Sequence, residues 1–222
     1  MKLFILCLTL GALPGLGENR QTPQVAPIAL YTSFEQEPSE GVVEAFHDEL
    51  ESIMTPMGMT FEWRSLSGVR GNELSVELAV LTFKGHCDIA GLNPHKVSNP
   101  GALGWTHVSD GAILPFSDVD CDRIRTFVQK DLLFVRPPDR EESFGRALAR
   151  VVAHELYHIF ANTSQHGSCG VGKAAYTVQE LLGDDLQFEG RESQALRTSK
   201  AHGVQENATR TPTPYVGRAL GL

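Results

Sequence analysis

Runs of basic residues are absent from this sequence, in which 19 Lys and Arg stand against 27 Asp and Glu. The formal net charge of −8 leaves no positive stripe that a phosphate backbone would attract. We therefore expect no binding to nucleic acid. Hydrophobic residues make up 41% and charged residues 21% of the 222 positions, which is typical of an ordinary single globular domain.

Long apolar runs are also missing, and the N-terminal one covers only residues 3–10. It follows Met1-Lys2 and precedes residues 11–17, which are mostly small and include a proline. This run is too short to cross a bilayer as a permanent anchor. A positive start, a short apolar core and small residues are typical of a secretory signal peptide. We predict a signal peptide over residues 1–17 and a protein exported to the periplasm or the extracellular space.

Cysteine is scarce, with four residues in the chain. Loss of the signal peptide would leave Cys87, Cys121 and Cys169, an odd number for an oxidising compartment. Cys87 and Cys121 each lie beside aspartates, and we predict a disulfide between them. Cys169 stays open as a free thiol, a metal ligand or a disulfide partner.

The most informative segment that is present is His154-Glu155-Leu156-Tyr157-His158, which matches the pattern HExxH. Residues four apart lie on one face of a helix, so both imidazoles can reach one metal ion. Glu155 lies beside that face, where it can accept a proton from a metal-bound water. Apart from these three side chains, residues 151–161 are uncharged, which indicates a buried helix. The alternative is a buried helix whose histidines only form hydrogen bonds.

Hydrophobic periodicity and turn residues outline the rest of the chain. Residues 124–135 fit either a helix or a strand, and Ser143 is the expected cap of the motif helix. The predicted strands cover residues 27–33, 59–66, 74–83 and 105–116, the last broken near Asp110-Gly111, and the predicted helices cover residues 41–54, 143–162 and 177–188.

This order of elements, together with the HExxH segment, resembles the zincin metallopeptidases. The resemblance implies an α+β fold in which a twisted mixed sheet packs on the motif helix, with a small, mostly irregular or helical C-terminal part. It also makes residues 105–116 the candidate edge strand beside the cleft. We expect the metallopeptidase domain over residues 18–201 and a weakly ordered tail over residues 202–222.

A catalytic zinc ion usually has three protein ligands and one open position. Metzincins supply the third ligand from the pattern HExxHxxGxxH, but here Ala161 and Ser164 stand at the glycine and histidine positions. His166 follows two residues later, and Asn162 could turn the chain because asparagine tolerates left-handed backbone geometry. We therefore predict His154, His158 and His166 as the metal ligands.

Two alternatives for the third ligand remain open. Glu180 lies in a Glu-x-x-x-Asp segment that resembles the second ligand helix of the thermolysin-like gluzincins, and Cys169 lies close to His166. A site with only two protein ligands is a further possibility.

The resemblance implies a zinc metalloendopeptidase, a hydrolase that acts on a peptide or protein substrate. With the signal peptide, we expect this enzyme to be secreted, and we expect it to be a monomer. Zinc lowers the pKa of its bound water, and Glu155 accepts the proton as general base. Tyr176 is a candidate for stabilising the oxyanion. The rival hypotheses are a non-catalytic zincin-fold protein that binds a metal or a partner, and a zinc hydrolase acting on another amide or an ester.

Overall fold

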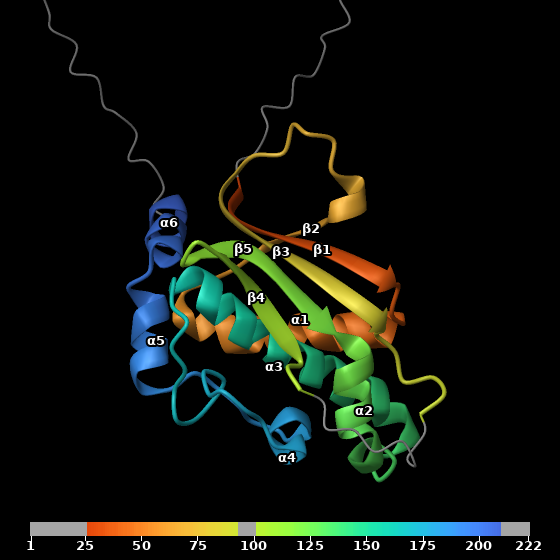
Figure 1. Ribbon diagram of the computed structural model, residues 1–222. Helices are drawn as coiled ribbons and strands as arrows, with labels where there is room; N and C mark the ends of the chain where they lie inside the picture. The colour runs from red at the N-terminus through yellow and green to blue at the C-terminus, as the bar shows by residue number, and fades with distance from the viewer. Residues whose placement is uncertain (1–25, 93–100, 210–222) are drawn as a thin grey trace, which may run out of the picture.

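The computed structural model describes residues 26–92 and 101–209 (Figure 1). The predicted signal peptide, residues 1–17, lies outside the described residues. Among the described helices, none is long and apolar enough to cross a membrane.

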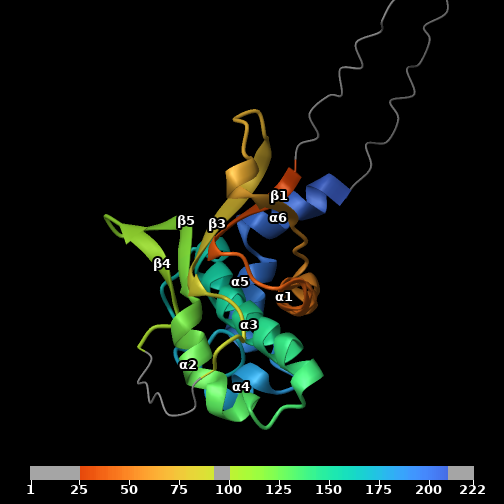
Figure 2. The same ribbon diagram turned by 90° about the vertical axis from the view of Figure 1, so that its right-hand side faces the viewer.

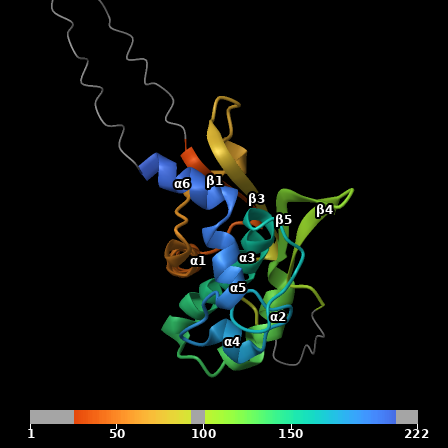
Figure 3. The same ribbon diagram turned by 90° about the vertical axis from the view of Figure 1, so that its left-hand side faces the viewer.

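A single five-stranded sheet forms the upper layer in Figure 1. The strand order is β2-β1-β3-β5-β4; β2, β1, β3 and β5 run parallel, and β4 pairs antiparallel with β5. Figures 2 and 3 show the tip of the β4–β5 hairpin standing out from the body of the molecule. The strands are β1 (Ala26–Gln36), β2 (Glu62–Ser65), β3 (Ser75–His86), β4 (Gly104–Ser109) and β5 (Ala112–Asp120).

Helices α1 to α5 lie below the sheet, where α1 and α3 lie side by side in all three views, and α6 lies beside β1 at the level of the strands. Alternate residues of β3, such as Leu81 and Phe83, are fully buried and join one core with Phe46 of the first helix and Val152 of the third. That alternation is what a strand with one covered face produces. The helices are α1 (Glu40–Met54), α2 (Cys121–Leu132), α3 (Arg140–Phe160), α4 (Val178–Leu182), α5 (Gly190–Arg197) and α6 (Lys200–Thr209).

The structure confirms the predicted α+β class, with a mixed sheet packed on the motif helix and a C-terminal part of short helices and irregular segments. The predicted strand over residues 105–116 is two strands that turn at Asp110 and Gly111, both of which have positive φ. Only the first of them, β4, lies at the edge of the sheet. Residues 124–135, left open between helix and strand, belong mainly to helix α2.

The predicted start of the motif helix was wrong by about one turn. Helix α3 begins at Arg140 with Asp139 as its N-cap residue, and the hydroxyl of Ser143 donates to the Asp139 carbonyl oxygen at 3.0 Å. Ser143 is therefore inside the helix and does not cap it. Glu141 and Glu142 occupy the first turn, where negative charge is favoured by the helix dipole.

Helix α6 extends into the segment that was predicted as a tail. Residues 202–209, predicted as part of a weakly ordered tail, continue helix α6, and the remainder of that tail lies outside the described residues. Ala201 is 2% exposed, and the side-chain amide of Gln205 donates to the Thr60 hydroxyl at 2.7 Å. These contacts are with segments distant in sequence, so no local pattern predicts them. The predicted helix over residues 177–188 is likewise shorter, ending at Leu182.

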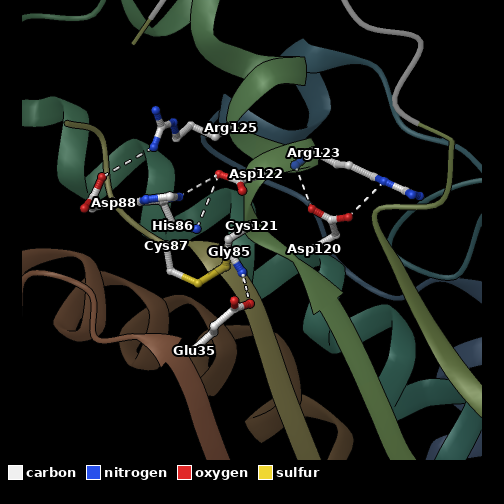
Figure 4. The surroundings of a disulfide bond; sticks show 10 residues. All are labelled: Glu35, Gly85, His86, Cys87, Asp88, Asp120, Cys121, Asp122, Arg123 and Arg125. Carbon is white, nitrogen blue, oxygen red and sulfur yellow. Dashed lines mark hydrogen bonds and ion pairs between the residues drawn. A yellow bond between two sulfur atoms is a disulfide. The ribbon is translucent and has the colours of Figure 1, made fainter. Parts of the chain in front are cut away.

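The predicted disulfide between Cys87 and Cys121 is confirmed, with the two Cα atoms 4.9 Å apart (Figure 4). It joins the end of β3 to the first residue of α2. Asp120 caps that helix by accepting from the Arg123 backbone N–H at 2.9 Å. Cys169 is a free, exposed thiol.

Replacement of both Cys87 and Cys121 by alanine is expected to lower the free energy of unfolding by about 4 kcal/mol, by loop-closure entropy. The bridge spans 34 residues, and both cysteines are buried. The closed loop contains β4, so the loss should also loosen the edge of the sheet. Urea unfolding of the oxidised protein and the double variant measures the difference. Equal midpoints would show that the bridge does not constrain the unfolded chain.

Candidate metal centre

Three histidines converge beneath the β4 edge of the sheet. His154 and His158 lie on α3 and are each 8% exposed, while His166 lies in the exposed segment that follows the helix. One ring nitrogen from each histidine lies within 4.8 Å of the other two. The His166 ring stacks on that of His154 at 5.1 Å and meets His158 edge-on at 4.8 Å. The structure thus brings together all three predicted ligands.

Asn162 makes this convergence possible. Its φ is 49°, in the left-handed region, two residues after helix α3 ends at Phe160. The Thr163 N–H then donates to the His158 carbonyl oxygen at 3.1 Å, which closes the turn. Asparagine accepts this geometry because its short polar side chain can compensate the steric cost. The reversal sends the following segment back across the helix, where His166 reaches the pair.

Two backbone carbonyl groups of the returning segment orient the helix histidines. Nδ1 of His154 lies 2.9 Å from the Val171 oxygen, and Nδ1 of His158 lies 2.7 Å from the Thr163 oxygen. A carbonyl oxygen only accepts, so each Nδ1 must carry the proton. In the neutral ring, Nε2 then bears the free lone pair. One segment therefore supplies both His166 and the groups that aim the other two rings.

The donor set fits a divalent metal ion such as zinc. Nε2 of His154 and Nε2 of His158 lie 3.0 Å apart, so two lone pairs face each other across a short gap. Two facing lone pairs repel each other, and a cation between the two nitrogens turns this repulsion into attraction. Tetrahedral zinc with Zn–N bonds of about 2.0–2.1 Å sets ligand nitrogens about 3.3 Å apart. The pair matches that separation closely, and His166 offers the third nitrogen.

Burial keeps the helix histidines neutral. It lowers the pKa of His154 to about 4, an effect that the hydrogen bond to Val171 opposes. Burial also lowers the pKa of His158. Since imidazole binds metals in its neutral form, both rings are in the ligand state at neutral pH.

Glu155 lies beside the histidines and outside the three-nitrogen cluster. The side chain is buried, with 4% of the residue exposed. Burial raises the pKa of this carboxyl to about 7, and hydrogen bonds from Thr106 act in the opposite direction. A carboxyl group with a pKa near neutrality can both accept and return a proton, as a general base and acid must.

Both rivals for the third ligand have other partners. The Glu180 carboxylate accepts from the Thr177 backbone N–H in a capping box and pairs with the Lys173 ammonium. The hydrogen bond from Lys173 is the main reason that the pKa of Glu180 falls to about 2. The Cys169 thiol donates to the Glu189 carboxylate at 3.4 Å. Among the described residues, neither joins the cluster of His154, His158 and His166.

Tyr176 lies close to the histidines in a different role from the one expected. Its hydroxyl donates to the Val171 carbonyl oxygen, which also accepts from His154. The tyrosine proton is therefore directed at a backbone carbonyl and away from a developing oxyanion. Burial raises the pKa of Tyr176, so the hydroxyl keeps its proton.

A cavity of about 550 Å³ opens over the cluster. Its far wall consists of residues 101–106, with Val108 and Ile113 from the β4–β5 hairpin and Phe127 from α2. The sequence predicts the edge strand but does not single out these individual residues. Strand pairing and helix packing place them here, and no short motif marks them. The remaining wall residues are His154, Glu155, His158, His166, Val151, Thr163, Ser164, Ala174, Ala175 and Tyr176.

No model of a known protein family matches this sequence, and no curated protein matches it. Among solved structures, the chain is similar to archaemetzincin (amzA) from Methanopyrus kandleri, at 14% sequence identity and a TM-score of 0.44. The match covers 80% of this chain and 96% of the archaemetzincin chain. We therefore base the proposed function on the geometry of the histidines and Glu155.

Proposed function

We propose that this protein is a secreted, zinc-dependent metalloendopeptidase of a divergent metzincin-like kind. The observation that carries the proposal is the convergence of three histidine nitrogens in the wall of a cavity that Glu155 also lines. Secretion is supported by the signal-peptide pattern of residues 1–17. The buried disulfide between Cys87 and Cys121 also suits an oxidising compartment.

His154, His158 and His166 would hold the metal, and the Val171 and Thr163 carbonyl groups keep two of the rings in the binding tautomer. Bound zinc would polarise a substrate carbonyl and lower the pKa of a coordinated water. Glu155 is placed to take up a proton during attack on the scissile bond and to return it to the leaving amine. Because the histidines would bind the metal and Glu155 would transfer the proton, the carboxylate lies next to the three histidines without belonging to their cluster.

The edge strand supports a peptide as the substrate. Strand β4 pairs with β5 on one side and is terminal in the sheet on the other, and its residues Gly104, Trp105 and Thr106 line the cavity. The free edge of a strand can pair with an extended peptide through backbone hydrogen bonds. A peptide laid along β4 would pass directly over Glu155.

His166→Ala is expected to lower zinc affinity by more than about 100-fold, the upper end of what an outer-shell substitution costs. Glu180→Gln is the matched control, because glutamine also serves in a capping box and Glu180 lies outside the cluster. Elemental analysis and chelator competition on the purified mature protein measure both variants. The opposite outcome, with zinc lost in Glu180→Gln and kept in His166→Ala, would favour the gluzincin arrangement.

Cleavage of a broad peptide library by the zinc-loaded protein tests the activity itself. We expect cleavage that stops when a chelator removes the metal and returns when zinc is added back. Zinc binding without any cleavage would leave a metal-binding protein, and turnover of simple esters or amides alone would indicate a different zinc hydrolase.

A further inference from the structure

A pair of hydroxyl groups on the last two strands of the sheet faces helix α3. Thr106 of β4 and Ser117 of β5 are direct partners in the antiparallel ladder. Their hydroxyl oxygens lie 2.8 Å apart. Ser117 is 1% exposed, so its hydroxyl is shielded from solvent.

The Thr106 hydroxyl contacts the candidate general base. Its oxygen lies 2.8 Å from Oε2 of Glu155 and 3.2 Å from the carbonyl oxygen of the same residue. When the Glu155 carboxyl is ionised, both of these atoms accept, so the single Thr106 proton goes to Glu155 in either case. Ser117 must then donate to Thr106. The two hydroxyl protons therefore point in one direction, from Ser117 through Thr106 to the carboxylate.

The second carboxylate oxygen of Glu155 has a different environment. Among the described residues, no hydrogen bond reaches Oε1, which lies beside Gly104 in the cavity wall. A Cβ atom on Gly104 would come within 3.0 Å of this oxygen and of Val151 Cγ1. Because residue 104 is a glycine, there is space beside Oε1. The other oxygen, Oε2, accepts a hydrogen bond from Thr106 of the sheet.

We propose that Thr106, supported by Ser117, is the positioning residue of Glu155. It anchors Oε2 to the edge strand and leaves Oε1 as the oxygen that exchanges protons with water and substrate in the cavity. The chemical part of this inference rests on the proposed peptidase function. Positioning of this kind has large kinetic weight, because a misplacement of about 1 Å can cost about 100-fold in rate.

Thr106→Val tests the role, since valine has nearly the same shape and no hydroxyl. We expect kcat for peptide hydrolysis to fall by about 10- to 100-fold, with KM and zinc affinity unchanged. Thr106→Ser keeps the donor and should stay within a few-fold of wild type. Ser117→Ala removes only the supporting hydroxyl and should give an intermediate loss.

Thr82→Val is the matched control. Thr82 lies on β3 between the core residues Leu81 and Phe83, so its side chain points to the opposite face of the sheet. This variant should retain kcat. A Thr106→Val protein as fast as wild type would overturn the proposal, and so would loss of zinc in that variant, which would make Thr106 a support of the metal site.

A second measurement does not require activity. Thr106→Val and Glu155→Leu, alone and combined, form a double-mutant cycle read by urea unfolding of the metal-free protein. At a pH above the Glu155 pKa of about 7, the hydrogen bond to the charged carboxylate predicts a coupling of at least about 10-fold in the unfolding equilibrium constant. If the wild-type protein cleaves no peptide, the proposed function fails and the cycle alone decides. Coupling would then support the anchored carboxylate, and its absence would overturn it.

Discussion

Glu155→Gln is expected to keep its zinc and to lose peptide hydrolysis by about 10²- to 10⁴-fold, the usual contribution of a general base. Glutamine has almost the same size, and its amide oxygen can still accept from Thr106. Packing around the residue should therefore survive. The amide cannot take up a proton at neutral pH, so the proton-transfer step is lost. Measurement of kcat/KM on a cleaved library peptide, with zinc content determined on the same sample, gives the answer.

Glu142→Gln is a suitable control for this experiment. Glu142 lies on the same helix, but its side chain is 64% exposed and pairs with Arg146. Its replacement should leave activity unchanged. Full activity in Glu155→Gln would end the assignment of Glu155 as the base. Loss of zinc in that variant would instead place the carboxylate in the coordination of the metal.

Glu49→Ala is expected to lower the free energy of unfolding by about 3–5 kcal/mol, because it breaks a buried ion pair from one side. Its partner, Arg150, is 0% exposed, and Nε of that side chain donates to Oε1 of Glu49 at 2.6 Å. A second guanidinium nitrogen donates to the Glu180 carbonyl oxygen at 2.6 Å. The arginine thus ties α3 to α1 and to α4, and without Glu49 its charge would stay buried and uncompensated.

The double variant Glu49→Leu with Arg150→Leu separates the loss of the pair from the loss of one partner. Replacing both charges by apolar side chains should cost much less than Glu49→Ala alone, since no charge is stranded. Urea unfolding of the three proteins measures the comparison. A Glu49→Ala protein as stable as wild type would show that Arg150 finds another partner. Arg150 lies four residues before His154 on the same helix, so the metal-free state should be used.

The fold was predictable where one face of an element is buried, because burial imposes a period of 2 or 3.6 on the sequence. The alternation in β3 and the uncharged stretch around the motif are examples, and both elements were predicted. The helix α6 was not, because it depends on contacts such as that between Gln205 and Thr60. The predicted helix over residues 177–188 ends early because Gly183, directly after Leu182, has extended backbone geometry with a ψ of 179°.

The sequence by itself determined the arrangement of His154, Glu155 and His158, because helical periodicity is a local property and places residues four apart on one face. For the third ligand the sequence favoured His166, with Glu180 and Cys169 as alternatives. Only the tertiary structure decided which of them reaches the other two histidines, through the left-handed turn at Asn162. Strand register likewise decided that Thr106 meets the carboxylate of Glu155. Both outcomes depend on how segments distant in sequence pack together, and the spacing of residues along the chain does not predict that packing.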